Sequence, residues 1–472
     1  MQKNKGLHAD VSGHHTVTGV IKLKAQKHSI QIGFTDKLIT AYGGLVALAG
    51  FGQWKGLQEI VKKSLPFQTT SPNAMPLSHV VSGYILGILA GGKKLTQLAY
   101  LRRDGGLAKL FDLERIPSQS TFSRFFQRFT QVHNQSFFNR LWQWSMHGVS
   151  CKGQGLALDF DSTQLLHEEA HQKEGIRTGH TVFGCKRCYH PLLATVTEVS
   201  VVAGFWLRPG NTRTDNNLIG FTHQVLANLP GSLKIRVIRA DSGFCNKEWF
   251  SLLEGLQIPY IVVARLHEPL KNLIRKTQVW EKTGLAGVEV CDTAYEGWKW
   301  GRARRIILIR HEIKERPQAG GRQLFECEQY RYQALLTSLP QSVSALKVWT
   351  HYNGRADMEN IIKELDFDFA LPQLCLKDFW ATEAAMSLSV VAYNLCVLFQ
   401  RFLYWKEEVK ASTLRFRLFC TGGLVSLSNG IHTLKLAVRT PAIRAWWRRL
   451  FEKISSEIPN CNAVEDLFKQ PT

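Results

Sequence analysis

Two apolar segments that each end in an aspartate constrain the fold of this chain more than any other feature. The first covers residues 155–161 and ends in Asp161, and the second covers 233–240 and is followed by Asp241. Their length and their aliphatic side chains are typical of buried strands. A helical pattern follows the second segment, and another strand-like run occupies 260–263. Strands that alternate with helices in this way predict an α/β fold.

The 472 residues are enough for roughly two to four domains, and the character of the sequence changes along the chain. Composition and periodicity divide it into a flexible basic arm at 1–34, a helical region at 35–150, an α/β core in two parts at 151–265 and 346–400, a β-rich segment at 266–345, and a basic helical C-terminal region at 401–472.

Local patterns predict where individual elements begin. Thr35 or Asp36 is expected to cap a first helix, Pro76 opens a second one, and helices are expected from Trp349 to the end of the chain. Further strands are predicted at 192–202, 287–291, 306–309 and 332–336.

The formal net charge of +21 indicates a polyanionic partner, and nucleic acid fits best. The basic first residues lack the apolar stretch of a secretory signal, so the ten scattered cysteines are expected to be reduced thiols in the cytoplasm. Cys185 and Cys188 lie close in sequence, but one such pair does not make a zinc site. Residues 384–399 are too polar to cross a membrane and are interpreted as a buried helix.

A third acidic motif lies far from the first two along the sequence. It predicts a helix with one charged stripe, which consists of Tyr352, Arg355, Glu359 and Lys363. Aspartate often ends strands because it favours turns, so Asp161 and Asp241 alone are weak signals. Asp159 shares a strand face with Asp161 and is an alternative ligand, but Asp161 lies nearer the strand end, where sites of α/β sheets gather.

Three carboxylates suit phosphodiester chemistry with two Mg²⁺ ions, for which Mn²⁺ is expected to substitute. One ion aligns an attacking water or 3′-hydroxyl, and the other stabilises the departing oxygen. Magnesium prefers a few carboxylates and keeps positions open for phosphate oxygens.

Candidate DNA contacts come from three other segments, the first of them in the helical region 35–150, which is expected to bind DNA. Ser118 is expected to cap a short helix that presents Ser120, Thr121 and Arg124, with Phe122 and its neighbours on the core face. This pattern suits a helix-turn-helix reader, and equally an ordinary capped helix in a bundle. A basic loop contains Arg208 and Arg213, and residues 401–450 carry ten Lys or Arg against two acids.

The motifs together resemble the DDE transposases of bacterial insertion sequences, in particular the insertion-sequence 1380-like members of the group with a Tyr-Arg-Glu signature helix. Tyr352, Arg355 and Glu359 match that signature by position. The acidic motifs at 161–163 and 239–244 match as well. Smaller matches lie at 117–121, 189–192 and 208–211, and the likeness spans about 35–450.

The resemblance implies a ribonuclease-H-like catalytic core, interrupted by a β-rich insertion between Asp241 and Glu359. It implies catalysis and metal binding by these two residues and Asp161. Relatives often carry a lysine seven positions after the glutamate, where this chain has Asp366, and Lys363 is the candidate substitute. The DNA contacts are expected from Tyr352, Arg355, Lys363, Arg208, Arg213, Ser120, Thr121 and Arg124.

We therefore expect a transposase that binds terminal inverted repeats, cleaves DNA and joins the 3′-hydroxyl to target DNA. Because two element ends must be held together, a homodimer is expected, in the bacterial cytoplasm at the nucleoid and without a membrane partner. Two other hypotheses are a DNA-binding protein that has lost catalysis and a metal-dependent nuclease that does not join strands.

Overall fold

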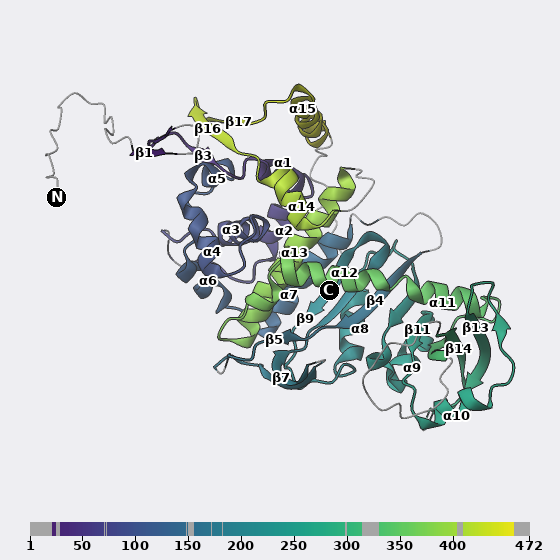
Figure 1. Ribbon diagram of the computed structural model, residues 1–472. Coiled ribbons are helices and arrows are strands. Elements are labelled where there is room, and N and C mark those ends of the chain that lie inside the picture. The colour runs from purple at the N-terminus through teal and green to yellow at the C-terminus, as the bar shows by residue number, and fades with distance from the viewer. Residues whose placement is uncertain are drawn as a thin grey trace, which may run out of the picture.

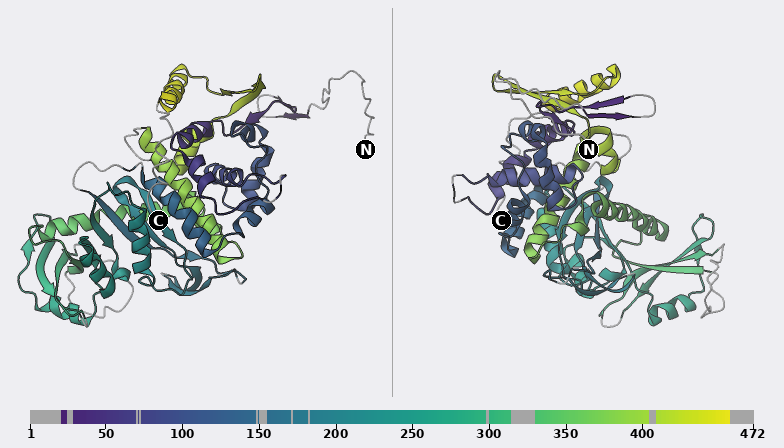
Figure 2. Two further views of the ribbon diagram at one scale, coloured as in Figure 1. Left: turned by 180° about the vertical axis from the view of Figure 1, so that it is seen from behind. Right: turned by 60° about the vertical axis from the view of Figure 1, so that its left-hand side comes forward.

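The chain has a mixed α/β fold in which a large sheet has helices on both faces and a helical region beside it (Figure 1). The computed structural model describes residues 21–24, 29–69, 71, 73–147, 149, 155–170, 172–181, 183–297, 300–313, 330–403 and 409–456. Two further views show one long helix running between the helical region and the sheet (Figure 2).

Within the described residues, nine strands form one sheet in the order β9-β8-β4-β10-β11-β15-β14-β13-β12. The neighbours β4, β10 and β11 are parallel, whereas the other adjacent pairs are antiparallel. The carboxyl ends of β4 and β10 therefore meet at one edge of the sheet. The strands are β4 Leu156–Ser162, β8 Leu192–Val196, β9 Val201–Trp206, β10 Ile235–Ala240, β11 Tyr260–Val263, β12 Glu281–Lys282, β13 Val288–Tyr295, β14 Arg304–Glu312 and β15 Tyr330–Thr337.

Segment 266–345 contains strands where the sequence predicts them, together with helix α10 (Glu268–Lys276). These strands are not a separate layer. β15 pairs with β11, so β12 to β15 extend the central sheet away from the helical region (Figure 1).

One expected strand is two strands. Residues 192–202 were predicted as a single run, but β8 ends at Val196 and the chain reverses through the 3-10 helix η2 (Thr197–Val199) into β9. Ser200 makes the reversal with a left-handed φ of 56°. The strand residues on both sides of the turn are buried, so the apolar run continues across it. Hydrophobicity alone therefore does not show where the first strand ends.

Alternate side chains of the central strands pack against different helices. On one face, Phe160 contacts Trp249 of α9. On the other, Ala157 shares a buried cluster with Val348 of α11. Asp161 lies on the face of Ala157, because residues two apart in a strand share a face. The covering helices are α8 Leu218–Asn228, α9 Lys247–Gly255, α11 Ala345–Asn353 and α12 Ala356–Asp368.

Helix α13 (Phe379–Phe402) joins the helical region to the sheet, because it packs against α3, α7 and β9. By length and composition it could span a membrane, but its apolar window is entirely buried inside the protein, as in the core helix of a globular domain. Around it lie α1 Leu45–Trp54, α2 Leu57–Ser64, α3 Leu77–Leu89, α4 Leu95–Tyr100, η1 Leu101–Arg103, α5 Gly105–Leu110, α6 Gln119–Phe126, α7 Gln131–His147 and η4 Leu371–Gln373.

The first predicted helix begins later than expected. The expected caps at 35–36 precede a short strand, β3 (Ile39–Thr40), and α1 begins only at Leu45. β3 pairs with a distant strand near the C-terminus, and the Thr40 hydroxyl donates to Asp104 at 2.7 Å. Long-range pairing therefore overrides the local helical spacing.

The prediction of an all-helical C-terminal region is wrong in part. After α14 (Ala411–Leu414) and the π-helix η5 (Arg415–Phe419), strands β16 (Gly423–Ser428) and β17 (Ile431–Leu436) form a hairpin, before α15 (Pro441–Ser456). Asn429 and Gly430 form its turn with φ of 51° and 77°. An Asn-Gly pair between alternating residues is a strong hairpin signal, and it was available in the sequence.

Two smaller sheets complete the fold. β1 (Ile21–Lys24) pairs with β2 (Ser29–Ile32), whereas the rest of the expected arm up to 28 lies outside the described residues. β7 (Gly184–Tyr189) pairs with β5 (Leu165–Leu166) and with β6 (Arg177–Thr181).

A buried carboxyl group on α13 predicts a pH-dependent stability. Glu383 accepts hydrogen bonds from the Leu207 backbone N–H at 3.0 Å and from the Asn134 amide at 2.8 Å. Burial raises the pKa of Glu383 from 4.5 to about 7, although both hydrogen bonds oppose the rise. The folded state therefore keeps a proton that the unfolded chain releases near its ordinary pKa. As pH rises through this window the free energy of unfolding falls, by about 3 kcal/mol from this group.

In Glu383→Gln this contribution should vanish. Urea unfolding at pH 5 and pH 8 is expected to show a loss of stability that is about 2–3 kcal/mol smaller in the variant than in the wild type. Glu452→Gln, on the exposed side of α15, is the control and should follow the wild type. Equal pH dependence in wild type and Glu383→Gln would contradict the prediction.

Candidate active site

The ends of β4 and β10 bring Asp161 and Asp241 to one edge of the sheet. The two strands are parallel, and Ala240 of β10 pairs with Phe160 of β4. Asp161 follows Phe160 within β4, and Asp241 follows Ala240 directly after β10 ends. Asp241 caps the 3-10 helix η3 (Ser242–Phe244), and its Oδ1 accepts a hydrogen bond from the Gly243 N–H at 2.8 Å. Because neighbouring strands lie about 4.8 Å apart, the two residues lie side by side.

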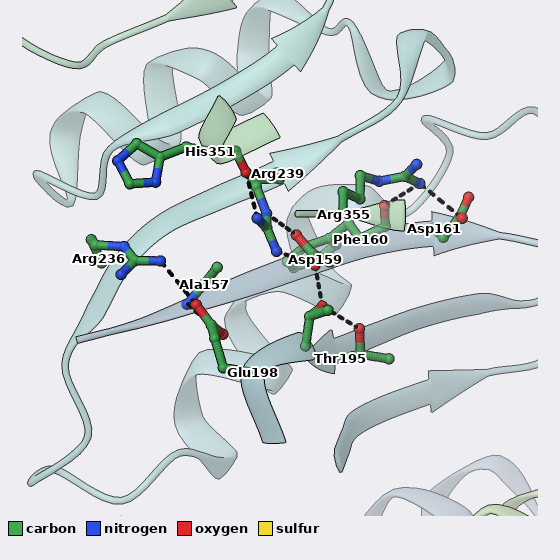
Figure 3. A network of polar contacts seen from close by, with 11 residues as sticks. Ala157, Asp159, Phe160, Asp161, Thr195, Glu198, Arg236, Arg239, His351 and Arg355 are labelled. Atoms are coloured by element: carbon green, nitrogen blue, oxygen red, sulfur yellow. Dashed lines mark hydrogen bonds and ion pairs between the residues drawn. The ribbon is translucent and has the colours of Figure 1, made fainter. Parts of the chain in front are cut away.

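Asp159, the alternative first ligand, has other partners. It is fully buried and forms a bidentate ion pair with Arg239, in which Oδ1 lies 2.6 Å from Nε and Oδ2 lies 2.7 Å from Nη2 (Figure 3). The Thr197 hydroxyl also donates to Oδ2. Both carboxylate oxygens are therefore occupied inside the protein, and this arrangement favours Asp161 as the metal ligand.

Asp161 is 9% exposed and faces a cation. Its Oδ2 lies 2.8 Å from Nη2 of Arg355, and its Oδ1 accepts a hydrogen bond from the Ser162 N–H at 2.8 Å. Burial raises the pKa of Asp161 from 3.8 to about 6; Arg355 lowers it, and the charges of Asp241 and Glu359 raise it. The three predicted acidic side chains are therefore close enough to influence one another.

The expected signature helix is broken. α11 ends at Asn353 and α12 begins at Ala356, with Gly354 and Arg355 forming a turn between them. The prediction of one continuous helix from Tyr352 is therefore wrong. Both turn residues keep right-handed helical angles, so the chain direction is nearly preserved across the break.

The guanidinium of Arg239 lies against the chain at this break. Its Nη1 donates a hydrogen bond to the His351 carbonyl in the last turn of α11 (Figure 3). A Cβ atom at Gly354 would lie 2.7 Å from that same Nη1, so a glycine allows the close approach. The buried pair of Arg239 with Asp159 thus anchors the end of α11 beside the sheet.

Tyr352 and Arg355 lie near the ends of β4 and β10, where Arg355 pairs with Asp161. Arg355 is 8% exposed, and besides its ion pair it donates to the Phe160 carbonyl at 3.2 Å. Burial raises the pKa of the Tyr352 phenol; Arg355 lowers it, and the charges of Asp241 and Asp161 raise it. The tyrosine therefore lies within electrostatic reach of Arg355, Asp161 and Asp241.

Glu359 differs from the aspartates because its side chain is exposed. It lies on α12 with 66% of its side chain accessible and pairs with Lys363 at 4.0 Å. In the part of the chain that the structure describes, no group of three Asp, Glu, His or Cys side chains is close enough to hold a metal ion. The aspartates are held by backbone N–H groups, whereas an exposed Glu359 can change rotamer without disturbing the core.

His190 is a site residue that the sequence-based selection missed. Its Nδ1 donates to the Thr212 carbonyl at 2.7 Å, so Nε2 accepts from the Ser162 hydroxyl at 3.0 Å when the ring is neutral. Burial lowers the pKa of His190, which favours this neutral form. The ring thereby fixes the residue next to Asp161. The motif at 189–192 was the available signal.

A family model described as transposase DDE domain group 1 matches residues 22–460, which is most of the chain. The protein belongs to this family of DDE transposases. It is therefore a DNA transposase, an enzyme that cleaves DNA, and its family generally uses divalent metal ions.

One solved structure to which this chain is similar is the cryo-EM structure of a piggyBac transposase synaptic complex with hairpin DNA. The TM-score is 0.41 at 12% sequence identity, and the likeness covers 90% of this chain and 88% of that chain. No curated protein matches the sequence.

The acidic residues of the transposase suit a divalent ion in their chemistry. Carboxylate oxygens are the ligands that Mg²⁺ prefers. The observation that fits is the raised pKa of Asp161, to which the charges of Asp241 and Glu359 contribute. A bound cation would relieve that repulsion and lower the pKa.

Arg208, which was predicted to contact DNA, is buried in this arrangement. It is 4% exposed, and its guanidinium donates to the carbonyls of His190, Arg213, Thr214 and Asn216. These hydrogen bonds stabilise the loop behind the active site of the transposase, so the Arg208 side chain has a structural role. Arg213 has 78% of its side chain exposed and pairs with Asp215 at 3.3 Å, so it stays a candidate phosphate contact.

The helix with the other predicted DNA contacts is α6. Ser118 caps it as expected, accepting from the Thr121 N–H, and the phenylalanines face the core. Ser120 and Arg124 are exposed. α6 packs against α3, α4 and α13, and residues 111–118 separate it from α5. That connection is longer than the turn of about three or four residues in helix-turn-helix readers, so a capped bundle helix describes α6 better.

Proposed function

We propose that Asp161, Asp241 and Glu359 hold two Mg²⁺ ions, or Mn²⁺ in their place, and that this site cleaves the ends of a mobile DNA element and joins them to target DNA. The observation that carries the proposal is the position of Asp161 and Asp241 at the ends of the adjacent parallel strands β4 and β10, with Arg355 in an ion pair to Asp161.

When bound, such ions supply an activated oxygen nucleophile and stabilise the departing oxygen. The residues of the chain then have separate tasks. Asp161 and Asp241 provide rigid ligands because backbone N–H groups fix them. Arg355, now paired with Asp161, is placed to neutralise a phosphate oxygen, and Tyr352 and Lys363 line the approach of the strand.

We place the core in the ribonuclease-H-like class and the protein in the insertion-sequence 1380-like group. Support for the core comes from the strand order β9-β8-β4-β10-β11, in which the first three are antiparallel neighbours and the last three are parallel. The β-rich segment then lies between Asp241 and Glu359 in sequence, as in an inserted unit. Of the expected domain limits, those of the two core parts, 151–265 and 346–400, are kept as part of this proposal.

The DNA partners in this proposal are terminal inverted repeats and a target duplex, bound by a homodimer in the cytoplasm at the nucleoid. Exposed basic residues that are available for phosphate contacts include Arg124, Arg213 and Arg448. A net charge of +21 supports strong, salt-dependent DNA binding.

The test is a cleavage and strand-transfer assay. A duplex with the inverted repeat that flanks the reading frame is incubated with the protein, a supercoiled plasmid and Mg²⁺. We expect cleaved ends and joined products, which disappear in EDTA and return with Mn²⁺. Cleavage without joined products would favour a nuclease, and binding with neither metal supporting cleavage would favour a non-catalytic DNA-binding protein.

A further inference from the structure

Helix α12, which carries Glu359, is held by an ion pair at each end. Where the helix begins, Arg355 pairs with Asp161 of the central sheet at 2.8 Å. Where it ends, Asp368 pairs with Arg415, the first residue of the π-helix η5, and Oδ1 of the aspartate lies 3.0 Å from Nη1 of the guanidinium. The position of Glu359 therefore depends on both ion pairs.

The same guanidinium also bonds to the last turn of α3 in the helical region. Nε of Arg415 donates to the Leu89 carbonyl at 2.9 Å, and Nη2 donates to the Ile88 carbonyl at 3.3 Å. Nη2 donates to the backbone carbonyl of Asp368 as well. One side chain thus joins the C-terminal ends of α3 and α12, where its positive charge is favourable beside the terminal carbonyls.

The contact between Asp368 and Arg415 is shielded from water. The two side chains are 13% and 12% exposed, and Cζ of the arginine lies 5.8 Å from the centroid of the Phe369 ring. Four positions before Asp368, Glu364 accepts a hydrogen bond from the Ala411 N–H at 2.7 Å. Residues four apart lie on one face of a helix, so one face of α12 contacts α14 and η5 at two points. Two points of contact restrict the rotation of α12 as well as its position.

Glu359 depends on this support because its own surroundings do not fix it. Its side chain is 66% exposed, and among the described residues the three predicted carboxylates are not gathered closely enough to hold a metal ion. Backbone N–H groups hold Asp161 and Asp241 in place. The placement of α12 therefore decides how far the glutamate must reach, and a misplacement of about 1 Å can cost about 100-fold in rate.

We propose that Arg415 is a positioning residue for DNA cleavage, which holds α12 against α3 and so sets where Glu359 lies relative to the two aspartates. Arg415 acts through α12 and contacts neither the metal ion nor the reacting phosphate. A displacement of the helical region is transmitted to the acidic helix through this one guanidinium. The inference rests on the proposed function, since it takes Glu359 as a metal ligand.

The experiment compares Arg415→Lys with the wild type in two measurements. Lysine keeps the positive charge, but a single ammonium group cannot reproduce the forked contacts to two helix ends. The Mg²⁺ concentration for half-maximal cleavage of the flanking inverted repeat should rise about 10- to 100-fold, the usual effect of losing a group that supports a metal ligand. In EDTA, hydrogen exchange followed by mass spectrometry should show faster exchange of the α12 amides.

A second variant guards against misfolding of the first. Asp368→Asn removes the negative charge but keeps an acceptor for Arg415, which retains its bonds to the α3 carbonyls. It should raise the half-maximal Mg²⁺ concentration and the α12 exchange rate in the same direction by a smaller factor. Both variants are assayed below their thermal transitions.

Arg310→Lys is the matched control. Arg310 of β14 pairs with Glu289 of β13, its side chain is 22% exposed, and its Cζ lies 4.5 Å from the centroid of the Trp280 ring. β14 is four strands away from β4 in the sheet. The control should therefore keep the wild-type Mg²⁺ dependence and the wild-type exchange of α12. Equally faster exchange of α12 and α9 in Arg415→Lys would overturn the proposal, because it would show only a general loss of stability.

The two proposals fail in different ways. If Glu359→Gln cleaves DNA like the wild type, the proposed metal site is wrong in that residue, and exchange in EDTA still decides whether Arg415 fixes α12. If Glu359→Gln loses cleavage but Arg415→Lys keeps the wild-type Mg²⁺ dependence and exchange, the positioning inference alone is wrong.

Discussion

Replacing Asp161 with asparagine is expected to slow DNA cleavage about a thousandfold or more, because a metal ligand contributes several kcal/mol at the transition state. Asp241→Asn and Glu359→Gln should have the same effect. None of the three residues supplies a positive charge to phosphate, so the affinity for element-end DNA in EDTA should not fall. Cleavage rates with Mg²⁺ and anisotropy in EDTA measure the two quantities separately.

Asp357→Asn is the control for these variants, since Asp357 is exposed on α12 two positions before Glu359. It should cleave at the wild-type rate. Thermal unfolding of Asp161→Asn shows whether the loss of its ion pair with Arg355 destabilises the fold, and the cleavage rate is compared only below that transition. A variant that retains more than about a tenth of wild-type cleavage would remove its residue from the metal site.

The strand-end aspartates could be predicted because both signals are local. β4, β10 and β11 are short apolar runs, and Asp161 and Asp241 follow at their ends. The Ser118 cap was also local, as it is set by residues within one turn. Burial and short-range hydrogen bonding therefore suffice to place these residues near one edge of a sheet.

Other predictions were wrong because the features they concern depend on long-range contacts. The pairing of β3 with β16 joins segments almost 400 residues apart, and the sequence near Ile39 does not predict it. The structural role of Arg208 could not be predicted either. A basic residue in a loop has the same sequence pattern whether its side chain faces solvent or donates to four carbonyls. The hairpin at Asn429–Gly430 is different, since its turn signal was present and helical expectation masked it.

Arg239→Met is expected to lower the free energy of unfolding by about 3–5 kcal/mol, because it leaves the fully buried Asp159 carboxylate without its cation. The control on the same strand is Arg236→Met. Arg236 pairs with Glu198 at 2.9 Å, but about a third of each side chain is exposed (Figure 3). Its loss should cost less than about 1 kcal/mol. Urea unfolding of both variants gives the comparison.

The double variant Asp159→Val/Arg239→Met separates stability from positioning. Replacing a whole buried ion pair with apolar residues is often close to neutral, so its unfolding free energy should return to within about 2 kcal/mol of the wild type. Cleavage should nevertheless stay about 10- to 100-fold slower, the usual cost of losing a group that orients a metal site. The reason is that methionine cannot donate to the His351 carbonyl, so the end of α11 loses its anchor and Arg355 shifts relative to Asp161. A double variant that regains both stability and full cleavage would show that the pair only stabilises the fold.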